Sequence, residues 1–395
     1  MYLLEKINRA SFIRSREEII MAVDIKSQNL LNRVLTEIRD RRDEFEAKRH
    51  VPRDMVDQLK QLGVYRAHAP RCFGGDALSP SEFLKLIESI SEADGSTGWV
   101  ASFGSSAVYL AALPRETLSQ IYADSPDVAF AGGLFPVQPA EKVEGGWRVN
   151  GLWKFASGCM GADLLGVGIG AGEGGKPLTA VLKPEDVDIV ENWEVIGMRG
   201  TGSHDLRVKD AIVSDEWTFV RGGVPSIEEP IYQYPSIAYA AQVLAVVNLG
   251  IARAALDEVS QMAGNRAGIT GAPKMAERAY LRISLAKAEA SLRSARSFFY
   301  EATDSAWESI LKGDGVSDDQ TSILRLAATQ AAREGARVVQ SAYLLSGTAA
   351  IYDGHPLQRH LRDAMVVTQH AFLNESMYDG AGSVFLGVPP IRGYI

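Results

Sequence analysis

The sequence predicts an α+β protein in which a β domain stands between two helical domains. Between about residues 128 and 213, helical spacing of apolar residues gives way to short β-favouring runs separated by Gly, Pro and Asp. On both sides of that stretch, apolar residues recur at helical spacing. A chain of 395 residues is also long for a single core. We predict an N-terminal extension (1–24), an N-terminal helical domain (25–126), a central β-barrel or sandwich domain (127–233) and a C-terminal four-helix bundle (234–395).

The N-terminal third has the pattern of successive helices. Apolar residues at helical spacing predict an amphipathic helix over Ser27–Lys48 and a second helix that starts at Pro52. Ser79 is a candidate N-cap for a third helix, with Pro80 at its first position. The nearly uncharged stretch Gly98–Leu113 predicts a buried helix.

The central part is predicted to consist of short strands. They cover Val128–Gly133, Lys142–Val149, Leu152–Ala156, Leu164–Ile169, Leu178–Leu182, Val187–Trp193 and Leu206–Val213. Val149-Asn150-Gly151 is interpreted as a tight turn between two of these strands. Gly170–Gly175 is predicted to be a flexible loop and not a nucleotide-binding fingerprint, because no helix opens after it.

The C-terminal part has three long helical patterns rich in Ala and Leu. They cover Ser236–Arg266, Ala276–Gly313 and Ser317–Ser346. Small side chains on a helix face allow close helix packing, and a four-helix bundle is the simplest way to bury such helices.

Composition argues against several classes of function. The net charge of −8 disfavours nucleic acid as a partner, because phosphate binding needs a basic face. Cys72 and Cys159 form no disulfide framework and no metal-ligand spacing, so we expect no metal. No stretch reads as a signal peptide or a membrane span, and we expect a cytoplasmic protein without a membrane partner. No G-x-G-x-x-G stands at a strand-to-helix junction, which disfavours direct use of NAD(P)H.

The stretch Gly145–Gly158, GGWRVNGLWKFASG, carries the most informative pattern. Its aromatic and β-branched residues suit a half-buried strand, and after Phe155 the side chains shrink abruptly. Small residues at a strand end let a large flat group approach the backbone, and Ser157 offers that group one hydroxyl. The residues alone also fit an ordinary Ser-Gly turn at the end of a hairpin strand.

This stretch resembles the flavin-contacting segment of the acyl-CoA dehydrogenase superfamily, NG-x-K-x-W-I-T/S-N-G. Here the segment is NGLWKFASG, with Phe155 at the Trp position and Ser157 at the Thr/Ser position. The ending W-x-F-A-S-G is similar to the two-component reduced-flavin monooxygenases of that fold, a group that includes the oxygenase component of p-hydroxyphenylacetate hydroxylase. The resemblance runs from about Asp43 to the C-terminus and implies an acyl-CoA dehydrogenase-like fold.

The resemblance also implies binding residues. Ile196–Asp205, IGMRGTGSHD, matches a loop that lines the flavin and substrate cavity, although the residues alone fit a Gly-rich turn. Arg266 and the segment Gln340–Asp363 match regions that reach the flavin of a neighbouring subunit, which implies a homotetramer. The implied flavin-binding residues are Phe155, Ala156, Ser157, Arg199, Thr201, Ser203, Arg266, Gln340, Gly347 and Arg359. The implied substrate-binding residues are Trp99, Phe103, Ser105, Ser106 and His370.

His370 and Ser157 are the implied catalytic residues. Counted from Arg362-Asp363, the position of the dehydrogenases' catalytic Glu falls on His370 or Ala371, and the monooxygenases have an active-site His there. An imidazole that titrates near neutrality can act as an acid or base, although a lone His in an apolar run is often structural. Many relatives carry a second His near Ser105–Ala107. This chain has none, which favours a neutral heterocycle such as indole.

The implied function is that of a two-component monooxygenase. A separate NAD(P)H-flavin reductase would supply FADH2 or FMNH2, and O2 would add at C4a. The hydroperoxide would then hydroxylate or epoxidise a small phenolic or indole-like substrate, with Ser157 protecting it and His370 positioning it or transferring a proton. Two alternatives stay open: an acyl-CoA dehydrogenase with Asp379 or Glu375 as base, and an inert flavin-fold scaffold.

Overall fold

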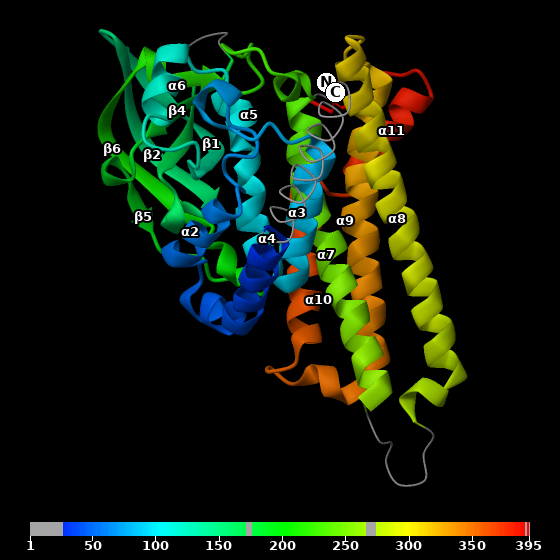
Figure 1. The fold of residues 1–395 in the computed structure, drawn as a ribbon. Helices are drawn as coiled ribbons and strands as arrows, with labels where there is room; N and C mark the ends of the chain where they lie inside the picture. Colours follow the sequence, from blue (N-terminus) through cyan, green and yellow to red (C-terminus); the bar gives the residue numbers. More distant parts are fainter. Residues whose placement is uncertain (1–26, 171–175, 266–273, 392, 395) are drawn as a thin grey trace, which may run out of the picture.

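The computed structural model describes residues 27–170, 176–265, 274–391 and 393–394. A helical N-terminal part, a central sheet and a helical C-terminal part follow one another along the chain, as the sequence predicts (Figure 1). The predicted extension over residues 1–24 and the flavin-binding candidate Arg266 lie outside the described residues.

The N-terminal part consists of short helices after a long one. They are the helix over residues 27–48, α2 (Arg53–Gln61), α3 (Pro80–Ala93), α4 (Gly95–Ser102), α5 (Ala107–Leu110) and α6 (Arg115–Ile121). Ser79 caps α3 in a reciprocal capping box with Glu82, as predicted for the start of this helix. The predicted single helix over Gly98–Leu113 is wrong, because a 3-10 segment, Phe103–Ser106, separates α4 from α5. There Gly104 approaches the Val64 carbonyl so closely that a Cβ would lie 2.2 Å from its oxygen.

The central domain is one seven-stranded mixed sheet with the order β5-β6-β2-β1-β3-β4-β7. The strands are β1 (Phe130–Val143), β2 (Gly146–Ala156), β3 (Leu164–Gly170), β4 (Leu178–Leu182), β5 (Asp188–Val190), β6 (His204–Ser214) and β7 (Thr218–Val220). β1 pairs with β3 in parallel, and the other pairs are antiparallel.

The predicted turn at Val149-Asn150-Gly151 is wrong. The hairpin turns at Gly145, which has a φ of +73°, and β2 then runs without interruption to Ala156. Asn150 instead lies at a register shift against β6, where its Oδ1 accepts a hydrogen bond of 2.6 Å from the Asp210 backbone N–H. The Asn-Gly pair therefore belongs to a bulge. The sequence pattern suggests a turn instead, because bulges and turns favour the same residues, which tolerate unusual backbone dihedral angles.

The C-terminal part is dominated by three long helices, α7 (Ser236–Asn265), α8 (Ala279–Lys312) and α9 (Asp318–Ser346). The shorter α10 (Pro356–Val367) packs against α7 and α9, and α11 (Ser376–Phe385) packs on α9. α7 also packs against α3, so the helical core is shared by the two helical domains. By length and composition the stretch Ser236–Gly264 could cross a membrane, but 83% of its most apolar window is buried inside the fold.

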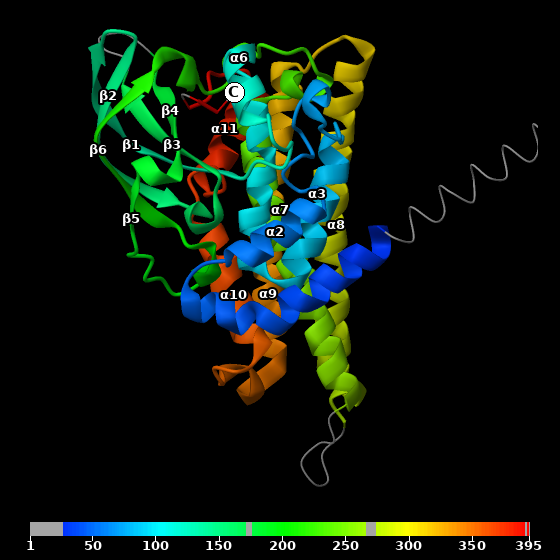
Figure 2. The ribbon, with the colours of Figure 1, turned by 60° about the vertical axis from the view of Figure 1, so that its left-hand side comes forward.

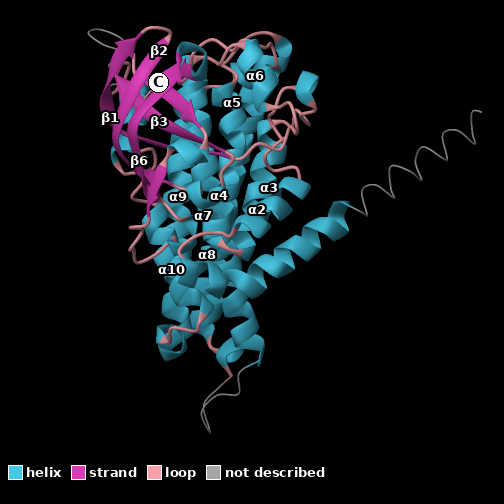
Figure 3. Ribbon diagram, turned by 90° about the vertical axis from the view of Figure 1, so that its left-hand side faces the viewer, coloured by secondary structure: helices cyan, strands magenta, loops and turns pink. Residues whose placement is uncertain are grey.

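The sheet lies beside the helices and brings the end of β2 close to them. Figure 3 shows the strands gathered on one side of the helical body, and Figure 2 shows the helix over residues 27–48 crossing near α10. The 3-10 turn Arg199–Thr201, which precedes β6, packs on α4. The Gly158 N–H, just after β2, donates a 2.8 Å hydrogen bond to the Thr201 carbonyl. Residues from the sheet, α4 and the segment after α10 can therefore share one site.

Candidate active site

Ser157, at the end of β2, is the first member of a buried chain of hydroxyls. The Trp99 indole donates to Ser157 Oγ at 3.1 Å, and Ser157 Oγ lies 2.6 Å from Ser203 Oγ. Ser203 Oγ lies 2.7 Å from Thr201 Oγ1, which donates to the Met198 carbonyl at 2.8 Å. The structure thus brings together three predicted flavin contacts and one predicted substrate contact.

The number of protons fixes the direction of this chain. The Thr201 hydroxyl has one proton, and it must face the Met198 carbonyl, because two oxygens at 2.8 Å repel each other without a proton between them. Ser203 must then donate to Thr201, and Ser157 must donate to Ser203. Ser157 Oγ also accepts from Trp99, so it keeps one free lone pair and no free proton. Ser157 is therefore set to accept a hydrogen bond from a ligand.

His370 lies in the turn after α10, next to the same tryptophan. Its ring centroid is 5.7 Å from that of Trp99, with an interplanar angle of 65°. The Phe372 backbone N–H donates to His370 Nδ1 at 3.2 Å, so the neutral ring carries its proton on Nε2. Burial, aided by the positive charge of Arg221, lowers the pKa of His370 to about 4. The expectation that this imidazole titrates near neutrality is therefore wrong: it is a neutral donor at physiological pH.

A small pocket opens beside Ser157. Its lining is mostly apolar and comes from α4, the 3-10 segment that follows it, β1 and the end of β2. The residues are Tyr65, Val100, Phe103, Ala129, Phe130, Ala131, Ser157, Gly158, Gly161 and Ala162. Phe103 thus lies with Ser157 as predicted. Ser105 and Ser106 are buried in the 3-10 segment and do not line this pocket.

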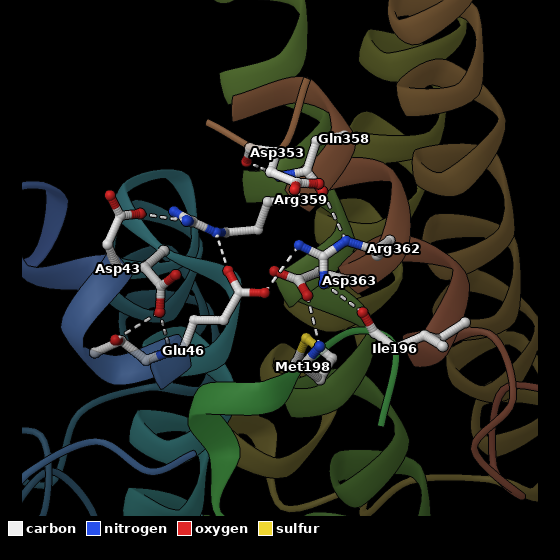
Figure 4. A network of polar contacts seen from close by, with 11 residues as sticks. Asp43, Glu46, Ile196, Met198, Asp353, Gln358, Arg359, Arg362 and Asp363 are labelled. Carbon is white, nitrogen blue, oxygen red and sulfur yellow. Dashed lines mark hydrogen bonds and ion pairs between the residues drawn. The ribbon is translucent and has the colours of Figure 1, made fainter. Parts of the chain in front are cut away.

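The loop that carries Met198 is fixed to α10 by polar contacts (Figure 4). The Asp363 carboxylate accepts a 2.5 Å hydrogen bond from the Met198 backbone N–H, and Met198 has a φ of +55°. The Arg362 guanidinium donates to the Ile196 carbonyl and to Glu46. Gly197 lies so close to the Arg362 carbonyl that a Cβ would be 2.4 Å from its oxygen. These contacts hold the carbonyl at which the hydroxyl chain ends.

Asp363 is a buried carboxyl whose proton affects the stability of this loop. Burial, together with the nearby charge of Asp94, raises the pKa of Asp363 to about 7. Its folded pKa lies above the unfolded value, so its contribution to stability is complete at low pH and is lost as pH rises through about 7. A shift from 3.8 to about 7 corresponds to at most about 4 kcal/mol.

We expect Asp363→Asn to be more stable than the wild type at pH 8, with an advantage that shrinks steadily as pH falls from 7 toward 4. The amide oxygen can still accept the Met198 N–H, while the ionisable group is gone. Thermal melts of both proteins across this range measure the difference, and Asp379→Asn, at an exposed position on α11, is the control. A variant that is less stable than the wild type at every pH would contradict this account.

The residues at the end of β2 fit a flavin. The segment after Trp153 offers Ala156, Ser157 and Gly158, whose small side chains leave the backbone accessible to a flat ring. Phe155 is 64% exposed and meets Trp193 edge to face, so one aromatic face is available for stacking. The free lone pair of Ser157 suits the N5–H of a reduced flavin better than the bare N5 of an oxidised one.

Other predicted flavin contacts do not join the Ser157 group. The Nε of Arg199 is buried with no hydrogen-bond partner in the described parts of the chain, and Arg199 lines a separate pocket together with Asp363. Arg359 is held by Asp43 and by Glu46, with 2.7 Å from its Nε to Glu46 Oε2 (Figure 4). Gln340 and Gly347 are exposed near the end of α9.

The carboxylates considered for a dehydrogenase do not face the Ser157 group. Glu375 is exposed and lies 3.5 Å from Arg333, and Asp379 is exposed on α11. Of the residues considered as a catalytic acid or base, His370 is the one that packs beside Trp99.

Sequence reasoning missed three residues near His370. Phe372 packs its ring against the imidazole at 5.2 Å, and Arg221 and Arg325 flank that ring. The only signal in the sequence is an arginine among the apolar residues of a long helix, SILRLAA, because such a position is usually buried.

Comparison with known proteins agrees with this geometry. The family "Acyl-CoA dehydrogenase, N-terminal domain" matches residues 29–121, and "Acyl-CoA dehydrogenase, C-terminal domain" matches residues 242–375. An indole-3-acetate monooxygenase of Pseudomonas putida is 54% identical over 92% of this chain and 94% of its own. The oxygenase component of an FADH2-dependent resorcinol hydroxylase of Rhizobium sp. is 29% identical over 88% of this chain and 91% of its own.

Solved structures extend the likeness to the fold. The 3-HSA hydroxylase of Rhodococcus sp. RHA1 superposes with a TM-score of 0.87 at 25% identity, covering 93% of this chain and 99% of that one. The sequence and fold comparisons cover nearly the whole chain, and the two family models cover parts of its helical domains. All of them agree with the resemblance drawn from the WKFASG segment. The chain belongs to the flavin-dependent monooxygenases of the acyl-CoA dehydrogenase superfamily.

Proposed function

We propose that this protein is the oxygenase component of a two-component monooxygenase that hydroxylates or epoxidises an indole-type substrate, with indole-3-acetate as the first candidate. A separate NAD(P)H-dependent reductase supplies FADH2 or FMNH2, and O2 is the second substrate. The observation that carries the proposal is the directed hydroxyl chain, which presents an acceptor at Ser157 beside a neutral His370. The 54% identical indole-3-acetate monooxygenase supports the substrate class.

Some residues of the proposed site bind the flavin, and others orient the substrate and the reacting oxygen. Ser157 would accept a hydrogen bond from the N5–H of a bound reduced flavin, and Phe155 and Ala156 would contact its ring. Bound reduced flavin supplies the two electrons with which one atom of O2 is transferred to the substrate and the other leaves as water. His370 donates from Nε2 toward the reacting oxygen, and Trp99 and Phe103 hold the aromatic substrate in a site that excludes water.

Product analysis tests this function. The purified protein, a generic flavin reductase, NADH and O2 are incubated with indole-3-acetate, indole and resorcinol, with either FAD or FMN present. We expect an oxygenated indole product that depends on every component. Oxidation of an acyl-CoA under anaerobic conditions, with no product from the aromatic compounds, would instead support the dehydrogenase alternative.

We also propose a homotetramer in which a neighbouring subunit completes the flavin site. Large apolar side chains are exposed around the end of α9, where Leu344, Ile351 and Tyr352 are 70%, 63% and 71% exposed. Gln340 and Gly347 lie in the same region. Light scattering should give four chains per particle, and Leu344→Glu should dissociate it and weaken flavin binding. A monomer that binds reduced flavin normally would contradict the shared site.

We propose that this enzyme is cytoplasmic. Both cysteines are free, one exposed and one buried, and the most apolar helix is largely buried in the fold. Fractionation of cells that express the protein should recover it with soluble cytoplasmic enzymes.

A further inference from the structure

Phe372, two residues after His370, is flanked by two arginines. The Cζ atoms of Arg325 and Arg221 lie 5.4 Å and 5.9 Å from the centre of its ring. The ring also meets His370 at 5.2 Å, with an interplanar angle of 68°. Among the described residues, neither arginine forms an ion pair with a carboxylate. Two uncompensated positive charges therefore lie one aromatic ring away from His370.

Arg325 is the less expected of the two because it is buried. Its side chain is 1% exposed, and within the described part of the chain its one side-chain hydrogen bond runs from Nη2 to the Met377 sulfur at 2.9 Å. Its Nε and Nη1 have no hydrogen-bond partner among the residues that the structure describes. A buried cation without a counter-ion costs several kcal/mol. The rings of Phe372 and Tyr394, each 5.4 Å away, offset only part of that cost. An anion bound nearby would offset the rest of the free-energy cost of burying this charge.

Arg221 follows β7 and is partly exposed, which makes it accessible to a ligand. Its guanidinium lies over the Tyr109 ring, with 4.5 Å from Cζ to the ring centre. Stacking on an aromatic face leaves the edge of the guanidinium, with its N–H groups, free for a carboxylate. Its positive charge contributes, after burial, to the lowered pKa of His370.

We propose that Arg221 and Arg325 form a carboxylate subsite around Phe372 that selects aromatic acids over neutral aromatic compounds. This inference rests on the proposed function. The substrate ring lies between Ser157, Trp99 and His370, and its short acidic side chain extends toward Phe372. Arg221 binds the carboxylate through paired charge-assisted hydrogen bonds, and Arg325 adds the second positive charge. In a protein of net charge −8, these two free arginines are a local attraction for an anion.

Equilibrium binding to the flavin-loaded enzyme tests the subsite. Calorimetry compares indole-3-acetate with indole-3-acetamide, which has nearly the same shape and no charge. We expect the wild type to bind the acid at least tenfold more tightly than the amide. Arg221→Met should reduce this ratio to about one and leave amide binding unchanged, and Arg221→Lys should restore part of it. Arg148→Met, at an exposed arginine of β2 paired with Glu141 and Asp210, is the matched control.

For Arg325, the melting temperature without ligand distinguishes a binding role from a structural role. We expect Arg325→Met to lower the acid-to-amide ratio while its melting temperature without ligand equals or exceeds that of the wild type, because the variant removes an unpaired buried charge. A lower melting temperature with an unchanged ratio would show that Arg325 serves the fold and would overturn its part in the subsite.

The outcomes separate this proposal from the proposed function. Equal binding of acid and amide by the wild type, or an unchanged preference in Arg221→Met, overturns the subsite even when indole is oxygenated normally. A loss of reduced-flavin affinity in both variants, with the acid preference intact, assigns the arginines to the flavin phosphate and also overturns it. A wild type that prefers the acid but oxygenates nothing leaves the subsite standing and removes the monooxygenase function.

Discussion

Replacing His370 by Asn should lower coupled oxygenation about 100-fold or more, the usual size of a general acid–base contribution. The reason is the loss of Nε2, the proton-donating nitrogen of the imidazole that packs beside Trp99. The asparagine oxygen can still accept the Phe372 N–H, so the turn after α10 should keep its conformation. Reduced-flavin affinity should change little, because Ser157 and its hydroxyl chain are untouched. The rate of product formation under saturating reduced flavin measures the effect.

His355, at the N-terminal end of α10, provides a matched control. Its Nδ1 accepts the Leu357 N–H, the same local contact that His370 makes with Phe372, but it caps the opposite end of α10. His355→Asn should therefore keep full activity. The dehydrogenase alternative would be supported if His370→Asn kept full oxygenation and if the protein oxidised an acyl-CoA in a reaction that Asp379→Asn abolished.

The pH dependence of this step should be flat around neutrality. With a pKa of about 4, His370 remains neutral from pH 6 to pH 8 and donates from Nε2 throughout. A lowered folded pKa means that its contribution to stability is complete above the unfolded value and is lost as pH falls toward 4. A fall in activity below pH 7 that disappears in His370→Asn would contradict the low pKa.

The order of domains could be predicted from the sequence because it depends on periodicity. Seven strand-like runs between helical patterns, and the capping box at Ser79, are local signals, and the structure confirms that fold. The Asn150-Gly151 turn failed because a bulge and a turn select the same residues, and only the pairing with β6 distinguishes them. The long helix expected over Gly98–Leu113 failed because the approach of Gly104 to Val64 is tertiary.

The site was predictable only as far as the motifs reach. Ser157, Ser203 and Thr201 lie together, as the WKFASG and IGMRGTGS segments indicated. The protonation of His370 was not predictable, because burial by residues distant in sequence sets it. Arg359 reads as a flavin ligand in the motif, yet it pairs with Glu46, which is 313 residues away in the chain. That Arg325 pairs with no carboxylate among the described residues is likewise visible only once the helices are packed.

Ser157→Ala should weaken binding of reduced flavin while leaving that of oxidised flavin nearly unchanged. In the hydroxyl chain the Ser157 proton is already donated to Ser203, so the free group is a lone pair. That lone pair can accept from a reduced N5–H and has nothing to donate to an oxidised N5. Leaving the N5–H without an acceptor costs about 1–3 kcal/mol, or roughly 5- to 150-fold in the Kd for reduced flavin. More O2 should also be released as H2O2 instead of reaching the substrate.

Ser203→Ala tests the direction of the chain itself. Without Ser203 to accept it, the Ser157 proton becomes available to a ligand, so oxidised flavin should bind more tightly than it does to the wild type. Ser91→Ala, at a buried serine of α3 that donates to the Ile87 carbonyl, is the control for removing a buried hydroxyl. Anaerobic titration with both redox forms gives the ratio of Kd values. Equal weakening of both forms by Ser157→Ala would show that Ser157 contacts a part of the flavin that does not change on reduction, and the directed chain would then have no role in selecting the reduced cofactor.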